Sequence, residues 1–203
     1  MTPNPASRHE SARPGRPRAF DKADALAAAL DVFWRQGYEA TSVDDLTRAM
    51  GLSRSSFYGC FGSKHDALLA AVQSYADASL EILSAIAREE TSPRVAVRRM
   101  IRAMVETEDT CRGCLLVNCI TELAPHDGRV RERIQHHLAQ VESLLAETVA
   151  RADATQAGPT DAANQARALL ALTVGAITLR KAGLPAEQVD AALARAEALL
   201  PGI

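Results

Sequence analysis

Apolar residues recur at intervals of three and four along most of the chain, the spacing of one face of an α-helix. The first such stripe follows Asp21, a good N-cap residue, and predicts a helix that ends near Gln36, before Gly37. Its inward residues are Leu26, Leu30, Phe33 and Trp34. This helix is the first of a series.

Longer stripes predict helices over residues 64–89, 93–109, 127–152, 161–182 and 185–200. Segment 110–125 is the least predictable part of the chain. Apolar residues make up 47% of the chain and aromatic residues only 4%, and few runs favour strands. With 203 residues, the chain is long enough for one or two domains. We therefore expect an all-α protein of about nine helices.

Between the first two long stripes lie two short helices with a tight turn. Ser42 is a good N-cap with Asp45 three residues on, and Gly51 supplies the left-handed backbone that ends a helix. Ser53 caps a second helix over 54–61. Two short helices joined by a turn that contains glycine form a helix-turn-helix. Its second helix has the size that enters a DNA major groove.

The second short helix has polar residues that suit DNA. Arg54, Ser55, Ser56 and Tyr58 offer donors for bases or phosphates, while Phe57 and Phe61 can point into the core. Spacing alone is equally compatible with a helical hairpin that has no role in nucleic-acid binding.

Charge is uneven along the chain although its net value is −2. Residues 1–64 hold nine Lys/Arg and seven Asp/Glu, and much of the basic excess lies before Lys22. Residues 1–18 are rich in Pro, Ser and Arg, which predicts a disordered basic arm. We expect Arg16 and Arg18 to contact phosphates or a minor groove, although the arm could also be a solubilising tail.

The segment from Arg16 to Lys64 resembles the N-terminal domain of TetR-family transcriptional regulators and covers about a quarter of the chain. Matching residues stand at fixed spacing, while Gly59-Cys60 departs from the bulkier polar pair that is usual before the Phe. The matching residues are Gly15-Arg16-Pro17-Arg18, Phe33-Trp34-Arg35-Gln36-Gly37-Tyr38, Thr41-Ser42-Val43, Asp45-Leu46, Ala49-Met50-Gly51-Leu52-Ser53, Ser56-Phe57-Tyr58, Phe61 and Lys64.

The resemblance implies a three-helix DNA-binding domain over 19–64, and a ligand-binding and dimerisation domain over 65–203. It places Tyr38, Thr41 and Ser42 near the DNA backbone and favours a phosphate contact for Lys64 at the positive end of its helix. The alternative for Lys64 is a solvated first-turn lysine. A short helix near Gly113 would border an effector pocket. Candidate pocket residues are Leu80, Met104, Leu115, Asn118, Cys119, Glu122 and Leu138.

Cys111 and Cys114 form a CxxC pair, which can hold a metal or a redox disulfide. No second ligand pair stands at a finger-like spacing, so buried thiols are the main expectation and a metal or thiol sensor is the alternative. His136 and His137 are adjacent and point in different directions, so they do not form a metal pair.

The helix over 161–182 is small or apolar on most of its circumference and must be covered on two sides. It could be a central core helix. By resemblance, it forms a two-fold interface with the last helix, so that a homodimer presents two recognition helices to DNA. The expected interface residues are Ala163, Ala166, Leu170, Val174, Ile177 and Leu193.

The favoured function is therefore a DNA-binding transcriptional regulator, a repressor released from its operator by a small-molecule effector. A regulator that responds to metal or oxidant through Cys111 and Cys114, and an interaction module with a vestigial helix-turn-helix, remain alternatives. The sequence shows neither a nucleophile–base pair nor a phosphate loop, so we do not expect an enzyme, and we expect no cofactor. No apolar run is long enough to span a membrane and no secretory signal is recognisable, which predicts a cytoplasmic protein.

Overall fold

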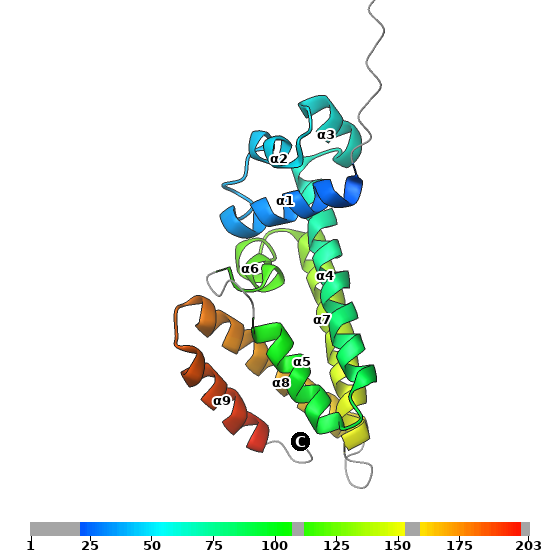
Figure 1. Cartoon of the computed structure of the whole chain (residues 1–203), viewed down its shortest axis with the longest axis vertical. Coiled ribbons are helices and arrows are strands. Elements are labelled where there is room, and N and C mark those ends of the chain that lie inside the picture. Colours follow the sequence, from blue (N-terminus) through cyan, green and yellow to red (C-terminus); the bar gives the residue numbers. More distant parts are fainter. Residues whose placement is uncertain (1–20, 107–111, 153–158, 200–203) are drawn as a thin grey trace, which may run out of the picture.

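A computed structural model describes residues 21–106, 112–152 and 159–199, which fold into nine helices without a strand (Figure 1). The prediction of an all-α fold is therefore confirmed. The helices are α1 (Lys22–Gln36), α2 (Val43–Met50), α3 (Arg54–Phe61), α4 (Lys64–Glu89), α5 (Pro93–Val105), α6 (Leu115–Glu122), α7 (Gly128–Ala152), α8 (Pro159–Lys181) and α9 (Ala186–Leu199). The fifth helix ends earlier than the sequence pattern suggests, and residues 107–109 lie outside the described part.

Helices α1, α2 and α3 form one end of the molecule (Figure 1). Ser42 and Asp45 make a reciprocal capping box at the start of α2. Gly51 ends α2 with φ +66°, a left-handed conformation that a side chain would strain. Ser53 then caps α3 by accepting a hydrogen bond from the backbone N–H of Ser56. These local signals fix where α2 begins and ends and where α3 begins.

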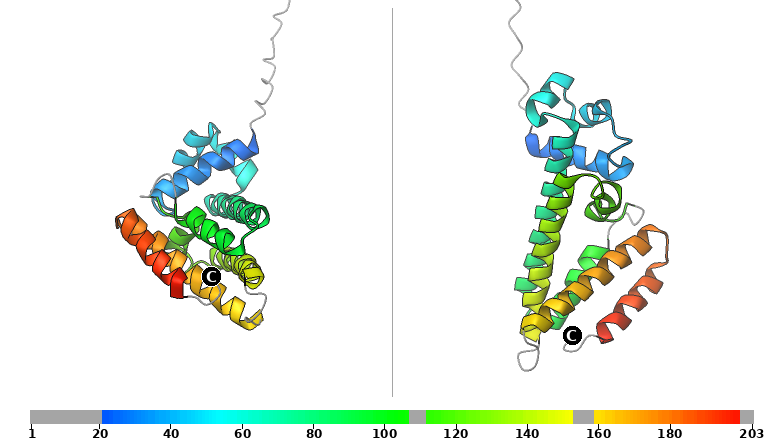
Figure 2. Two further views of the ribbon diagram at one scale, coloured as in Figure 1. Left: turned by 60° about the horizontal axis from the view of Figure 1, so that its bottom comes forward. Right: turned by 180° about the vertical axis from the view of Figure 1, so that it is seen from behind.

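Helix α4 runs from this end along the length of the molecule, with α7 beside it (Figures 1 and 2). Helices α5 and α8 pack against α7, and α9 packs mainly against α8. A cap residue, Ser63, fixes the start of α4 by accepting from the N–H of Asp66. The long helix thus connects the helix-turn-helix to the rest of the chain.

Buried apolar residues form two clusters along this axis. The first joins α1, α2 and α3 to the beginning of α4, to α6 and to the beginning of α7. The second lies between the far parts of α4 and α7 and helices α5, α8 and α9. The predicted domain boundary after Lys64 stays a prediction, but Leu68, Leu116 and Ile134 belong to the same core as Phe57. The helix-turn-helix therefore shares its core with α6.

In the parts of the chain that are described, we find no helix long and apolar enough to cross a membrane.

Candidate DNA interface and ligand cavities

Helix α3 is anchored on one side and open on the other. Phe57 is fully buried and Phe61 nearly so, and their rings lie 5.6 Å apart. Arg54, Ser55 and Tyr58 are exposed, with Tyr58 at 49%. The open face of α3 therefore carries the polar groups that the sequence predicted for DNA reading.

Arg54 is paired with Asp44 of α2 in the absence of DNA. Its Nε and Nη2 lie 2.8 and 2.7 Å from the two carboxylate oxygens, a bidentate contact. The hydrogen bond from Arg54 holds the pKa of Asp44 below its ordinary value. Both side chains are more than half exposed, so water screens the pair and its exchange is easy. Arg54 can thus exchange this carboxylate for a phosphate.

The serines at the start of α3 are part of its cap. The hydroxyl of Ser53 lies 3.0 Å from that of Ser55 and 2.9 Å from that of Ser56. The hydroxyl of Ser42 is also engaged in a hydrogen bond, which it donates to the Asp45 carboxylate at 2.5 Å. These hydroxyls are therefore held at fixed positions at the tip of the helix-turn-helix.

Three of the predicted backbone-contacting residues stabilise the turn between α1 and α2. The Lys64 ammonium donates to the carbonyl oxygens of Tyr38 and Thr41, both at 2.9 Å, and lies 4.1 Å from the centre of the Tyr38 ring. Thr41 is 1% exposed and donates to the Gly37 carbonyl at 2.6 Å. Burial raises the pKa of the Tyr38 hydroxyl. These two hydrogen bonds use two of the three donors of the ammonium, so a phosphate contact from Lys64 would have to use the third.

An apolar cavity of about 80 Å³ lies among α4, α5, α6, α7 and α8. Of the predicted effector residues, Met104 and Leu138 line it. Leu116, Val117 and Ile120 form the α6 side of its wall. No Asp, Glu, Lys or Arg occurs among the described residues around this cavity, although His137 lines it.

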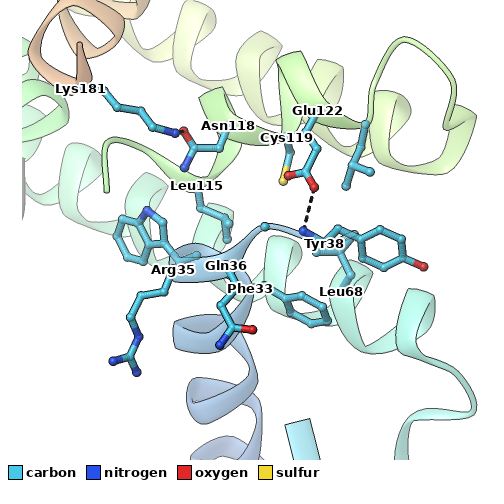
Figure 3. A pocket seen from close by; sticks show the side chains of 13 residues that line it. Phe33, Arg35, Gln36, Tyr38, Leu68, Leu115, Asn118, Cys119, Glu122 and Lys181 are labelled. Carbon is cyan, nitrogen blue, oxygen red and sulfur yellow. Dashed lines mark hydrogen bonds between the residues drawn. The ribbon is translucent and has the colours of Figure 1, made fainter. Parts of the chain in front are cut away.

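A second pocket, of about 220 Å³, lies where the end of α1 meets α6 and the end of α8 (Figure 3). Leu115, Asn118, Cys119 and Glu122 line this junction pocket, so the predicted effector residues divide between two sites. Leu80 lines neither described pocket and packs against the second apolar cluster.

The walls of the junction pocket are tied together by hydrogen bonds. A Glu122 oxygen accepts from the backbone N–H of Tyr38 at 2.8 Å (Figure 3). The same oxygen accepts from the backbone N–H of Glu39 at 3.2 Å. The Trp34 indole N–H donates to the Gly113 carbonyl at 3.1 Å, just before α6. Lys181 of α8 donates to Asn118 at 2.6 Å. Helix α6 is thereby fastened to the α1–α2 turn, which sequence reasoning missed because these partners are far apart in the chain.

The three described cysteines, Cys60, Cys114 and Cys119, are free thiols. Burial raises the pKa of Cys119 to about 12, so it is a poor thiolate nucleophile in this state. The Tyr75 hydroxyl donates to the Cys114 sulfur at 3.6 Å. Cys111, Arg16 and Arg18 lie outside the described residues, as does the arm over 1–18. The described part of the chain contains no group of three or more His, Cys, Asp or Glu arranged to hold a metal.

The expected dimer residues do not form one outward face. Ala166 is fully buried within the subunit and Ile177 nearly so, while Leu170 and Val174 line the apolar cavity. Ala163 and Leu193 are half-buried. Ala166 and Ile177 are covered within the subunit and leave little surface for a second one, while the dimer interface itself stays a prediction. The outward residues of α8 are instead displaced around the helix, at Leu172, Gly175 and Leu179.

A helix-turn-helix with an exposed polar α3, joined by one long helix to a helical body with cavities, defines a DNA-binding transcriptional regulator. The family model described as bacterial regulatory proteins of the tetR family matches residues 25–72, and that of the tetracyclin repressor-like C-terminal domain matches residues 91–197. The chain belongs to the TetR family.

Relatives agree with this assignment. An HTH-type transcriptional regulator of Bacillus subtilis, YezE, is 32% identical over 68% of this chain and 73% of its own length. The HTH-type transcriptional repressor ComR of Escherichia coli is 32% identical over 64% of each chain. A solved structure of the TetR-family regulator CifR, a cysteine mutant bound to 26-bp operator DNA, is 31% identical, with a TM-score of 0.79 over 92% of this chain and 100% of that one.

Proposed function

We propose that this regulator is a homodimeric repressor that leaves its operator when a small molecule enters the apolar cavity. The observation that carries this proposal is the double role of α6. One face of α6 lines the cavity through Leu116, Val117 and Ile120, and the helix end holds the α1–α2 turn through Glu122. A ligand that displaces α6 would therefore act on the DNA-binding helices.

The DNA half of the proposal rests on α3. In a two-fold dimer, two copies of α3 enter successive major grooves when their spacing matches one helical turn, about 34 Å. Arg54 and Tyr58 are exposed on α3 and are suited to contact bases or phosphates. The structure of CifR with operator DNA supports the same mode of binding here.

The outward face of α8 supports the dimer. Leu172 and Leu179 are 42% and 44% exposed, and a side chain added at Gly175 between them would meet nothing within 4 Å. Small and apolar residues allow two helices to approach closely. An isologous contact of this face with its own copy would bury both leucines of each subunit.

Release follows from linkage between the two sites. An effector shifts the equilibrium between two states only by its difference in affinity for them. The cavity of about 80 Å³ is far smaller than the roughly 300–1,000 Å³ of sites that hold drug-sized ligands. A larger effector must therefore widen the cavity, and it would bind the widened state more tightly than the DNA-binding state.

The decisive experiment is fluorescence anisotropy of the purified protein with DNA from upstream of its own gene, at several salt concentrations. The double variant Arg54→Ala, Tyr58→Ala should lose specific binding while remaining dimeric in sedimentation. The matched control is Arg94→Ala, which removes an exposed arginine at the start of α5. Unchanged binding by the double variant would reject α3 as the reading helix.

A thiol-responsive regulator is the second candidate. The solved structure of the similar protein CifR with operator DNA is that of a cysteine mutant. In this chain, Cys114 is half-buried and contacts the Tyr75 hydroxyl beside the apolar cavity, so its oxidation would perturb that wall. Operator binding of the Cys111→Ser, Cys114→Ser variant should then become insensitive to hydrogen peroxide. A response equal to that of the natural protein would remove this candidate.

A further inference from the structure

His137 of α7 is the one buried histidine among those described, and it lines the apolar cavity. We propose that His137 is the polar recognition residue of this cavity, which takes an uncharged, mainly apolar small molecule with one hydrogen-bonding oxygen, such as an alcohol or a ketone. This inference rests on the proposed effector site and specifies its ligand.

The lining of the cavity sets the ligand's charge. Its described residues include no Asp, Glu, Lys or Arg. An ionised ligand would therefore lose its hydration without gaining a partner of opposite charge, which is strongly unfavourable. The aliphatic walls from α5, α6 and α8 instead favour an apolar body.

Two other polar side chains in the wall are already engaged, and the third, Ser79 of α4, is only half-buried. The Thr173 hydroxyl donates to the Leu169 carbonyl at 2.7 Å, and the Tyr75 hydroxyl donates to the sulfur of Cys114. The Nδ1 atom of His137 is different, because it is buried and has no hydrogen-bond partner in the described structure. Such an atom is uncommon in folded proteins, since it loses its water and gains nothing in return. A ligand oxygen would supply the missing partner.

The imidazole suits either kind of oxygen. A neutral imidazole has one donor and one acceptor nitrogen, and its tautomer adapts to the partner. It can accept from an alcohol or donate to a ketone. Since Nδ1 is covered by the surrounding atoms, the ligand would reach it as the cavity widens or as the ring flips.

The ring is also neutral near pH 7. Burial lowers the pKa of His137; the nearby charge of Asp77 opposes this shift and that of His136 adds to it. A carboxylate ligand would therefore have no imidazolium to pair with. The lining of the cavity and the protonation state of His137 thus both favour an uncharged ligand.

The test uses benzyl alcohol, acetophenone, toluene and benzoate, four probes of similar shape that differ in polarity. Binding is followed near neutral pH by the 13C-methyl resonance of Met104, which lines the cavity. Benzyl alcohol and acetophenone should bind about three- to tenfold more tightly than toluene, the value of one net hydrogen bond. Benzoate should not shift Met104.

Replacing His137 by Leu should abolish the preference for the oxygen-bearing probes and leave toluene binding intact. His136→Leu is the matched control, because His136 is exposed and does not line the cavity. If the His137→Leu protein does not fold, imidazole 15N resonances of the natural protein give the same answer. The His137 signal should move with benzyl alcohol and remain still with toluene.

The inference is overturned if benzoate binds at Met104, if toluene equals benzyl alcohol, if no probe moves Met104, or if His137→Leu keeps the preference. Operator release by the same probes is measured separately by anisotropy. Selective binding through His137 without release would uphold this inference and count against the proposed repressor mechanism. Release without a preference that depends on His137 would support the proposed repressor mechanism and overturn this inference.

Discussion

The two sides of α6 differ in chemistry although they belong to one helix of eight residues. Leu116, Val117 and Ile120 face an apolar cavity, whereas Asn118 and Glu122 face the junction pocket and hold hydrogen bonds to α8 and to the α1–α2 turn. The apolar side can respond to the size and the apolar surface of a ligand. The polar side fixes the position of α6 relative to α8 and the α1–α2 turn through hydrogen bonds. A short helix can therefore line a ligand cavity and hold a DNA-binding domain with separate residues.

Enlarging the apolar side should have the largest effect on stability. Leu116→Ala removes a buried side chain from the cavity wall and from the core that includes Phe57. We expect a loss of about 2–4 kcal/mol in the free energy of unfolding. Chemical denaturation measures it. Val95→Ala, which truncates an exposed residue of α5, is the control and should change stability little.

Removing the polar contact should have a smaller effect on stability and a specific effect on DNA. Glu122→Ala leaves the N–H groups of Tyr38 and Glu39 without their acceptor. We expect a loss of about 1–3 kcal/mol in stability and a fall in operator affinity on the order of tenfold. Thr121→Ala, an exposed neighbour on α6, is the control. Equal operator affinity of the Glu122 and Thr121 variants would show that this contact does not position the reading helix.

A change at the DNA-binding end should bypass α6 altogether. Asp44→Asn weakens the pairing of Arg54 and removes a negative charge near the expected DNA surface. Operator affinity should rise by about two- to fivefold, with a steeper dependence on salt. Asp24→Asn, an exposed acidic residue in the first turn of α1, is the comparison variant. A weaker complex with Asp44→Asn would mean that the carboxylate orients Arg54 for binding.

Acidification should have the smallest effect. Because burial lowers the pKa of His137 from its ordinary value of 6.5, the unfolded chain takes up a proton that the folded state resists. The contribution of His137 to the free energy of unfolding is therefore complete above about pH 6.5, and it is lost as the pH falls below that value. His137→Leu should reduce the fall in Tm between neutral and mildly acidic pH. An identical pH profile in both proteins would contradict a buried neutral ring.

The helix-turn-helix could be predicted from the sequence because its signals are local. Ser42, Gly51 and Ser53 fix the ends of α2 and α3 within a few residues, and Phe57 fixes which side of α3 turns inward. The predicted DNA-binding residues Arg54 and Tyr58 are accordingly exposed.

The helical body was harder to predict because its contacts join distant segments. A stripe of apolar residues looks the same whether it lines a cavity, a core or a subunit surface. Leu170 and Val174, expected at a dimer surface, line the apolar cavity for this reason. The partners of Glu122 stand 84 and 83 residues away, beyond the reach of any local pattern.

The most direct test of coupling through α6 is amide hydrogen exchange at Tyr38 and Glu39, the two groups that donate to Glu122. Exchange is measured with and without saturating benzyl alcohol, and the Met104 methyl resonance reports occupancy of the cavity. Coupling predicts that exchange at both amides accelerates several-fold when the cavity is filled. Unchanged exchange at full occupancy would contradict it.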